Sequence, residues 1–126
     1  MPSPTDRRYL DSHEWHKAEG GGLVAIGISR RAVDELTDIT FVDVPDASKE
    51  IKAGESFGEV ESVKATSELY CGIDGRIMEV NGEVLANPAL INEDCYERGW
   101  IIRVQPKDPA QLNHLMAAAD YDKLQS

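Results

Sequence analysis

The chain has 126 residues, a size that predicts one domain with its own hydrophobic core. Its formal net charge of −10 argues against binding to nucleic acid or to an anionic membrane, because both favour a basic protein surface. No apolar run approaches the roughly 18 residues that cross a bilayer, and the N-terminus lacks the hydrophobic stretch of a secretory signal. We therefore expect a cytoplasmic protein, with a flexible N-terminus at residues 1–8 and a single domain at residues 9–126.

The first half of the chain combines strand and turn signals with one short helix. Three consecutive glycines at 20–22 predict a sharp turn, since glycine tolerates positive φ. A buried strand is expected at residues 23–28. Ser29 is then a suitable N-cap for a helix over residues 30–36. Strand character resumes at residues 39–44, where apolar and polar side chains alternate.

A weak internal repeat follows. Residues 56–60 and 76–80 share the pattern x-apolar-x-Glu-Val and predict two similar strands of a pseudo-symmetric β sandwich. The Asn81-Gly82 pair is a strong turn signal. The last clear strand is expected at residues 100–104. The second half of the domain is therefore predicted to be mainly β.

Two helices are predicted after the repeat. Asn87 and Pro88 indicate a one-turn helix with Asn87 as its cap and Pro88 at its first position. A closing helix is expected to begin at Asp108-Pro109. Its apolar stripe consists of Leu112, Leu115, Met116 and Ala119. We interpret this stripe as cover for the core.

Between the two copies of the repeat, residues 57–70 are predicted to form a hairpin with Lys64 at its tip. Glu59, Glu61 and Glu68 surround this lysine, and the residues beside it are small. A single lysine in an acidic hairpin with small neighbours is well placed to be held and modified by another protein. The alternative is a solvated lysine that pairs with neighbouring carboxylates, an arrangement that contributes little to stability.

The hairpin resembles the lipoyl-attachment motif of the glycine cleavage system H protein family, with the residues Glu61-Ser62-Val63-Lys64-Ala65-Thr66-Ser67. Further segments match that family in order and at compatible spacing: Ser12-His13-Glu14-Trp15, residues 38–45, residues 75–81, Leu90-Ile91-Asn92 and Gly99-Trp100-Ile101-Ile102. The similarity extends from about Tyr9 to Tyr121. Biotinyl domains differ by placing methionines beside the lysine, and lipoyl domains of 2-oxoacid dehydrogenases by an Asp before it.

The resemblance implies a mainly β fold of the lipoyl/biotinyl-type barrel-sandwich hybrid, with a few short peripheral helices and a C-terminal helix. It also implies a carrier rather than an enzyme. The cofactor would be lipoic acid, covalently bound to Lys64 in amide linkage. The chemistry then belongs to the carried group, while the protein supplies position and shelter.

The implied partners act in sequence on the carried group. The pyridoxal-phosphate-dependent glycine decarboxylase (P protein) loads an aminomethyl group from glycine, and the aminomethyltransferase (T protein) passes its carbon to tetrahydrofolate. Dihydrolipoyl dehydrogenase (L protein) reoxidises the dithiol. A lipoate ligase or a lipoyl/octanoyl transferase would attach the cofactor. The carrier itself is expected to be a monomer.

The resemblance further implies a surface cleft that shelters the loaded arm. Its residues would be Ser12, Glu14 and Glu68, with Glu68 standing where the family commonly has Asp. Two carboxylates and a hydroxyl are suitable acceptors for the cationic amine of the carried group. The alternative for Ser12 and Glu14 is that they form an ordinary polar strand edge.

The sequence contains no catalytic constellation. Ser12, His13 and Glu14 are contiguous, but neighbours along a strand face opposite sides. There is no GxSxG elbow, no phosphate-binding glycine loop and no zinc motif, so we predict no catalytic residue and no metal site. Cys71 and Cys95 form no CxxC pair and are expected to be reduced and structural.

Two alternatives to the glycine cleavage carrier remain open. One is a related protein that mainly donates lipoyl groups to other lipoyl-dependent complexes. The other is an unmodified scaffold domain of the same fold. Arg30 and Arg31 stand in a segment where the family more usually has Thr-Asp-His-Ala, and they lie near the expected partner-facing region. We therefore expect these two arginines to bear on the choice of partner.

Overall fold

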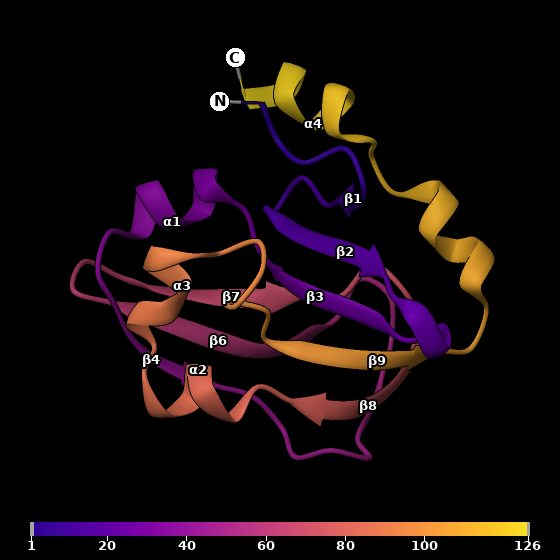
Figure 1. Ribbon diagram of the computed structural model, residues 1–126, viewed down its shortest axis with the longest axis horizontal. Helices are drawn as coiled ribbons and strands as arrows, with labels where there is room; N and C mark the ends of the chain where they lie inside the picture. Colours follow the sequence, from indigo (N-terminus) through magenta and orange to yellow (C-terminus); the bar gives the residue numbers. More distant parts are fainter. Residues whose placement is uncertain (1, 126) are drawn as a thin grey trace.

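Two antiparallel β-sheets enclose the main hydrophobic core of the protein (Figure 1). The computed structural model describes residues 2–125. The larger sheet has the strand order β1 (Arg8–Tyr9), β2 (Glu14–Ala18), β3 (Val24–Ile28), β9 (Ile102–Pro106), β8 (Gly75–Val80) and β5 (Glu50–Ile51). The smaller sheet has the order β4 (Ile39–Asp43), β6 (Ser56–Ser62) and β7 (Thr66–Tyr70).

Short helices surround the sheets. They are α1 (Arg30–Leu36), α2 (Gly82–Ala86), α3 (Ala89–Glu93) and α4 (Ala118–Gln125), with 3₁₀ turns η1 (Gly20–Gly22) and η2 (Pro109–His114). Figure 1 shows α1, α2 and α3 at one end of the sheets, whereas α4 lies above β1. The predicted fold class, a mainly β barrel-sandwich with peripheral helices and a C-terminal helix, is confirmed. No helix within residues 2–125 is long and apolar enough to cross a membrane.

Strand β3 has hydrophobic layers on both of its faces. Successive side chains of a strand point to opposite sides, so Val24, Ile26 and Ile28 enter the core between the sheets. Ala25 lies on the other face, in a second cluster with Tyr9, Trp15, Ala118 and Tyr121. This second layer lies beneath α4 and attaches the C-terminal helix to the large sheet.

Several local predictions are confirmed. The Ser29 side chain accepts a hydrogen bond from the Ala32 amide at the start of α1. Gly21 and Gly22 have φ of 83° and 81° in the predicted glycine turn. Both copies of the internal repeat form strands, β6 and β8.

The turn predicted at Asn81-Gly82 is instead the start of helix α2. Asn81 instead caps α2, with its side chain accepting from the Glu83 amide at 3.1 Å. Its amide nitrogen also donates to the carbonyls of Arg98 at 3.0 Å and Trp100 at 2.7 Å. These two carbonyl groups, 17 and 19 residues away in the sequence, therefore decide the conformation here. The next cap also differs, because Pro88 rather than Asn87 occupies the N-cap position of α3.

The single closing helix predicted from residue 108 is also wrong. Asp108 does cap the first turn, by accepting from the Ala110 amide at 3.0 Å. The helix ends at Leu115, whose backbone is extended. Met116 then exchanges backbone hydrogen bonds of 2.8 and 3.0 Å with Tyr9. This pairing with β1 separates η2 from α4, and it outweighs the local helical pattern.

The N-terminal segment has several contacts with the body of the fold. The Ser3 amide and hydroxyl donate to the Asp122 carboxylate at 3.0 and 2.6 Å. The Arg7 guanidinium is buried, stacks over Trp15 and donates to the Tyr96 carbonyl at 2.7 Å. The flexibility expected of residues 1–8 and the single domain at 9–126 stay predictions.

Candidate functional site: a lysine hairpin beside an acidic cleft

The turn between β6 and β7 presents Lys64 at its apex. The Ser62 amide donates to the Ala65 carbonyl at 2.8 Å, and the Ser62 hydroxyl donates to the same carbonyl at 3.2 Å. The Ser62 Oγ atom also accepts from the amides of Lys64 and Ala65, both at 3.1 Å. The Val63 amide donates to the Asp38 carbonyl at 3.0 Å and so joins the turn to the start of β4. These five bonds define the backbone on which the lysine stands.

Glycine is required at one position of the strand that leads into this turn. A Cβ atom at Gly58 would overlap the backbone carbonyl of Asp43 on β4. The absence of a side chain therefore allows β4 and β6 to approach closely.

The Lys64 side chain is exposed, and within residues 2–125 its ammonium group has no ion pair or hydrogen bond. Val63 beside it is 65% exposed. The three neighbouring glutamates that the sequence places around the lysine do not pair with it. The alternative of a salt-bridged turn lysine is therefore not what the structure shows.

A small cleft of about 140 Å³ lies beside this hairpin. At roughly 30 Å³ per water molecule, the cleft has room for a small polar group rather than a large ligand. Most of its walls come from the start of β2, helix α1 and strand β7, and β3 and β6 contribute one residue each. The lining residues are Ser12, His13, Glu14, Ile28, Ala32, Glu35, Leu36, Val60, Ser67, Glu68 and Leu69. All three residues predicted for the cleft are among them.

Glu14 is the buried carboxylate of the cleft, with 1% of its surface exposed. Its Oε1 atom accepts from the Ser12 hydroxyl at 2.5 Å, and its Oε2 atom accepts from the Tyr70 amide at 2.8 Å. Burial raises the pKa of Glu14 to about 7, while these two hydrogen bonds act in the opposite direction. The group therefore titrates near neutral pH, and a nearby cation would favour its ionised form.

The other two predicted residues lie at the rim. Ser12 is exposed and oriented by its bond to Glu14. Glu68 is exposed on β7, where its Oε2 atom accepts from the Tyr70 hydroxyl at 2.8 Å. Glu68 is one methylene longer than an Asp at this position would be, and the Tyr70 hydroxyl provides a hydrogen-bond donor for its carboxylate.

Sequence reasoning did not identify two groups that shape the cleft. One is the backbone amide of Tyr70, which carries no side-chain signal in the sequence. The other is His13, whose backbone adopts a positive φ of 85°. The neighbours Ser12 and Glu14 gave no indication of this conformation, because it depends on the contact between His13 and Tyr121 of α4.

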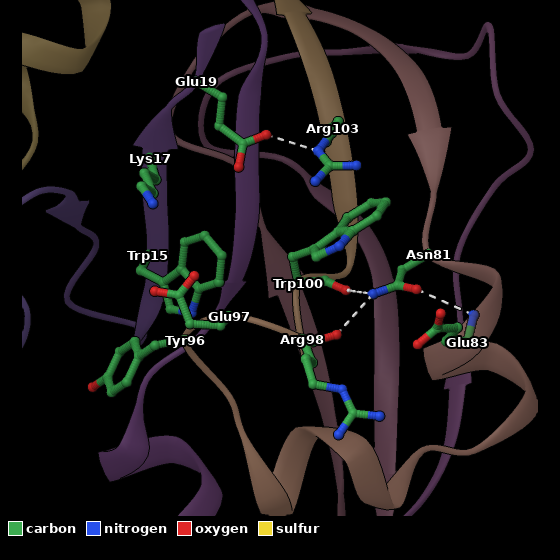
Figure 2. Close-up of a pocket in the computed structure, with 10 residues that line it drawn as sticks. All are labelled: Trp15, Lys17, Glu19, Asn81, Glu83, Tyr96, Glu97, Arg98, Trp100 and Arg103. Atoms are coloured by element: carbon green, nitrogen blue, oxygen red, sulfur yellow. Dashed lines mark hydrogen bonds and ion pairs between the residues drawn. The ribbon is translucent and has the colours of Figure 1, made fainter.

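Figure 2 shows another pocket, of about 490 Å³, on the face of the large sheet that carries the Trp15 cluster. Several of its polar groups bind one another. Arg103 pairs with Glu19 at 2.7 Å and stacks over Trp100 at 3.9 Å from the ring centroid, while Asn81 holds the 98–100 backbone. This arrangement organises the loop before β9, and it contains none of the residues predicted for the functional site.

The cysteines are free and buried in the core. Burial raises the pKa of Cys71 to about 12 and that of Cys95 to about 11, so both thiols are poor nucleophiles. The two unusual arginines lie on α1. Arg30 donates to the Asn92 carbonyl at 3.3 Å, and Arg31 lies 3.5 Å from Glu35.

A two-sheet barrel-sandwich that presents one unpaired lysine from a tight hairpin is the architecture of lipoyl- and biotinyl-type carrier domains. The comparisons with known proteins specify the family. The model of the family described as Glycine cleavage H-protein matches residues 7–126. The chain therefore belongs to the glycine cleavage H-protein family, as the sequence motifs predicted.

Individual relatives agree with this assignment. A glycine cleavage system H protein of Vibrio atlanticus is 52% identical over 114 residues, which cover 90% of each chain. One of Bacillus licheniformis is 46% identical over 124 residues, which cover 98% of this chain and 97% of that protein. The crystal structure of a glycine cleavage system H protein from Mycobacterium marinum matches with a TM-score of 0.89 at 38% identity, covering 97% of this chain and 98% of that one.

Proposed function

We propose that this chain is the lipoyl-bearing carrier of a glycine cleavage system, with lipoic acid joined to the Nζ atom of Lys64. The observation that carries the proposal is the exposed and unpaired Lys64 ammonium group at the apex of a hydrogen-bonded turn. Acylation of this amine removes its charge, and within the described residues it breaks no ion pair. The hairpin therefore fits the group that the family motif implies.

Lipoic acid, when attached, would supply the redox-active sulfur atoms and the group-carrying chemistry. The chain's own residues provide a flexible tether and a place of shelter. Tethering keeps the carried carbon at a high local concentration near each partner. The partners are the P, T and L proteins, and a lipoate ligase or lipoyl/octanoyl transferase supplies the cofactor. We further propose that the carrier acts as a cytoplasmic monomer and is not itself an enzyme.

We propose that the cleft beside the hairpin holds the cationic amine of the loaded arm. Ser67, Glu68 and Leu69 of the lining lie only a few residues after Lys64 on the same hairpin, within reach of a long acyl chain on that lysine. The Glu14 carboxylate offers its charge, while Ser12 and Glu68 accept from the remaining N–H groups. The cation in turn lowers the pKa of Glu14 and keeps it ionised at neutral pH.

The test of the attachment site compares Lys64→Arg with Lys52→Arg. Both substitutions keep a positive charge at an exposed position outside the core. We expect Lys64→Arg to abolish the mass gain of one lipoyl group in the presence of ligase, and with it all glycine–CO₂ exchange that the protein supports. Lys52→Arg should behave like the wild type. A lipoyl group on Lys52 in the Lys64→Arg protein would refute the assignment.

Intact mass of the protein from its native source separates the remaining alternatives. An unmodified mass under lipoate-replete conditions would favour the scaffold domain. A lipoylated protein that fails to support exchange with the P protein, yet donates its lipoyl group to another lipoyl domain, would favour the relay function.

A further inference from the structure

The hydroxyl of Tyr121, on the C-terminal helix α4, connects two walls of the cleft. It lies 2.6 Å from His13 Nδ1 and 2.6 Å from Ser29 Oγ. His13 lines the cleft between Ser12 and Glu14. Ser29 caps helix α1, which contributes the facing residues Ala32, Glu35 and Leu36. A single oxygen atom near the C-terminus therefore contacts segments that lie 108 and 92 residues away.

The hydrogens of this cluster can be assigned by giving each hydroxyl proton an acceptor. Ser29 Oγ accepts from the Ala32 amide, which leaves its own proton for the Tyr121 oxygen. The Tyr121 proton then goes to His13 Nδ1, and the imidazole carries its proton on Nε2, 3.7 Å from a Glu35 oxygen. This chain of bonds requires a neutral His13, and burial lowers the pKa of that group accordingly.

The backbone at His13 needs such support. A positive φ is uncommon for a residue other than glycine, and it persists only where the surroundings hold it. The His13 carbonyl accepts from the Ser29 amide at 2.8 Å, and the ring contacts Tyr121 edge to face. Tyr121 is itself fixed by stacking on Tyr9, with ring centroids 4.7 Å apart. The side chain of His13 thus faces α4, while its two neighbours present their oxygens to the cleft.

We propose that Tyr121 is a positioning residue for the cleft: its hydroxyl holds the 12–14 segment against the N-cap of α1, and so sets the orientation and seclusion of Glu14. The C-terminal helix is thereby a functional part of the site rather than a cover for the sheet. This inference rests on the proposed function only in taking the ligand of the cleft to be the cationic amine of the loaded arm.

The test removes one oxygen atom from each tyrosine of the stacked pair. Tyr121→Phe deletes the hydroxyl that contacts the cleft walls and keeps the ring. Tyr9→Phe is the matched control, because its hydroxyl donates to the Pro4 carbonyl at 2.7 Å and contacts no cleft residue. Each substitution removes one hydroxyl from the same aromatic pair and should lower the thermal midpoint, with the larger decrease in Tyr121→Phe because that hydroxyl makes two hydrogen bonds.

The decisive measurement is the pKa of the Glu14 carboxyl, followed by carbon NMR on unlipoylated protein. In Tyr121→Phe the 12–14 segment loses its support and water reaches the carboxylate, so the pKa should fall from about 7 towards the ordinary glutamate value. In Tyr9→Phe it should not change. Equal Glu14 pKa values in Tyr121→Phe and the wild type would overturn the inference. This readout needs neither lipoate nor a partner enzyme.

Two further measurements separate this inference from the proposed function. The loaded adduct should decay roughly three- to ten-fold faster in Tyr121→Phe than in Tyr9→Phe, the effect expected for losing one hydrogen bond. Adduct decay that is equal in the wild type and in Glu14→Gln would refute the sheltering function, while the Glu14 pKa still decides the role of Tyr121. The effect of Tyr121→Phe on the Glu14 pKa should also vanish in a His13→Asn background. Both substitutions break the bond between Tyr121 and His13 that holds the 12–14 segment, and asparagine tolerates the positive φ. Additive effects of the two substitutions would contradict the proposed link.

Discussion

Lys64 and Glu14 occupy opposite environments, and each environment suits the proposed role. The lysine is exposed and keeps its amine available for acylation. The glutamate is buried but retains two hydrogen-bond donors, from Ser12 and from the Tyr70 amide. A carboxylate that is partly desolvated interacts more strongly with a cation than an exposed one does, because less of the attraction is screened by water. This is the property required of a group that retains an ammonium ion.

Replacing Glu14 with Gln tests this electrostatic role with little change of shape. The amide oxygen can still accept from Ser12 or from the Tyr70 amide, but the negative charge is lost. We expect lipoylation to be unaffected and the aminomethyl adduct to decay about ten-fold faster or more, since a charge-assisted hydrogen bond is lost. The measurement is adduct decay followed by mass spectrometry without partner enzymes.

The pH dependence of that comparison provides a second check. Only ionised Glu14 pairs with the cation, and burial raises the pKa of this group to about 7. The ratio of the two decay rates should therefore increase as the pH rises from 6 to 8 and approach one in more acidic solution. The ratio cancels any intrinsic pH dependence of the adduct. A ratio that stays constant across this range would show that Glu14 does not act through its charge.

The hairpin β6–β7 is the element on which carrier function depends, and a single serine defines its turn. Ser62 takes part in four of the five hydrogen bonds of the turn, three of them through its hydroxyl. Serine hydroxyls commonly close turns of this kind by bonding to nearby backbone groups. The turn presents the lysine in one backbone conformation, which lowers the ordering cost when an attaching enzyme binds.

Ser62→Ala should therefore slow lipoyl attachment. We expect the ligase kcat/KM for the purified apo-protein to fall about three- to ten-fold, because the ligase must order a looser turn. Ser56→Ala is the matched control at the other end of β6, where the hydroxyl makes one bond, to the Gly58 carbonyl at 3.1 Å. Equal rates for the two variants would mean that the turn conformation does not limit recognition.

Across the whole molecule, two side chains of β2 bind backbone amides at the end of β7 and in the loop that follows it. Glu14 accepts from the Tyr70 amide, and two residues further on His16 Nε2 accepts from the Gly72 amide at 3.0 Å. His16 is buried, and burial lowers its pKa to about 3. Protonation would place a hydrogen on Nε2 opposite the Gly72 N–H group and break this connection. Glu14 and His16 thus share one face of β2, but burial raises the pKa of Glu14 and lowers that of His16.

The stability of the protein should reflect this difference. Between pH 6.5 and about 3 the unfolded chain binds a proton at His16 that the folded chain does not, so the free energy of unfolding falls as the pH falls. The slope from this group is at most about 1.4 kcal/mol per pH unit. Glu14 has the opposite sign between pH 4.5 and about 7, where the folded chain holds the extra proton.

Urea unfolding of the wild type and His16→Gln between pH 4 and 7 isolates the histidine contribution. Glutamine keeps an acceptor for the Gly72 amide and does not titrate. The wild type should lose stability relative to this variant as the pH decreases. Parallel curves for the two proteins would contradict the assignment of an acid-sensitive connection to His16.

The residues that the sequence by itself determined are those whose roles depend on their immediate neighbours. The motif around Lys64 predicted both the hairpin and the family, and Ser29 predicted the start of α1. In each case the decisive contacts lie within a few residues along the chain, so local pattern and side-chain chemistry were sufficient. The placement of Ser12, Glu14 and Glu68 beside one cleft came from the family resemblance rather than from spacing.

The tertiary structure alone decided features whose partners are distant in sequence. Asn81 caps a helix instead of forming an isolated turn because the 98–100 backbone binds its side chain. The C-terminal helix is divided because Met116 pairs with β1. The backbone of His13 and its contact with Tyr121 depend on a separation of 108 residues. Local sequence patterns contain no record of such contacts, and the free energy of these hydrogen bonds exceeds the small conformational preferences of the residues involved.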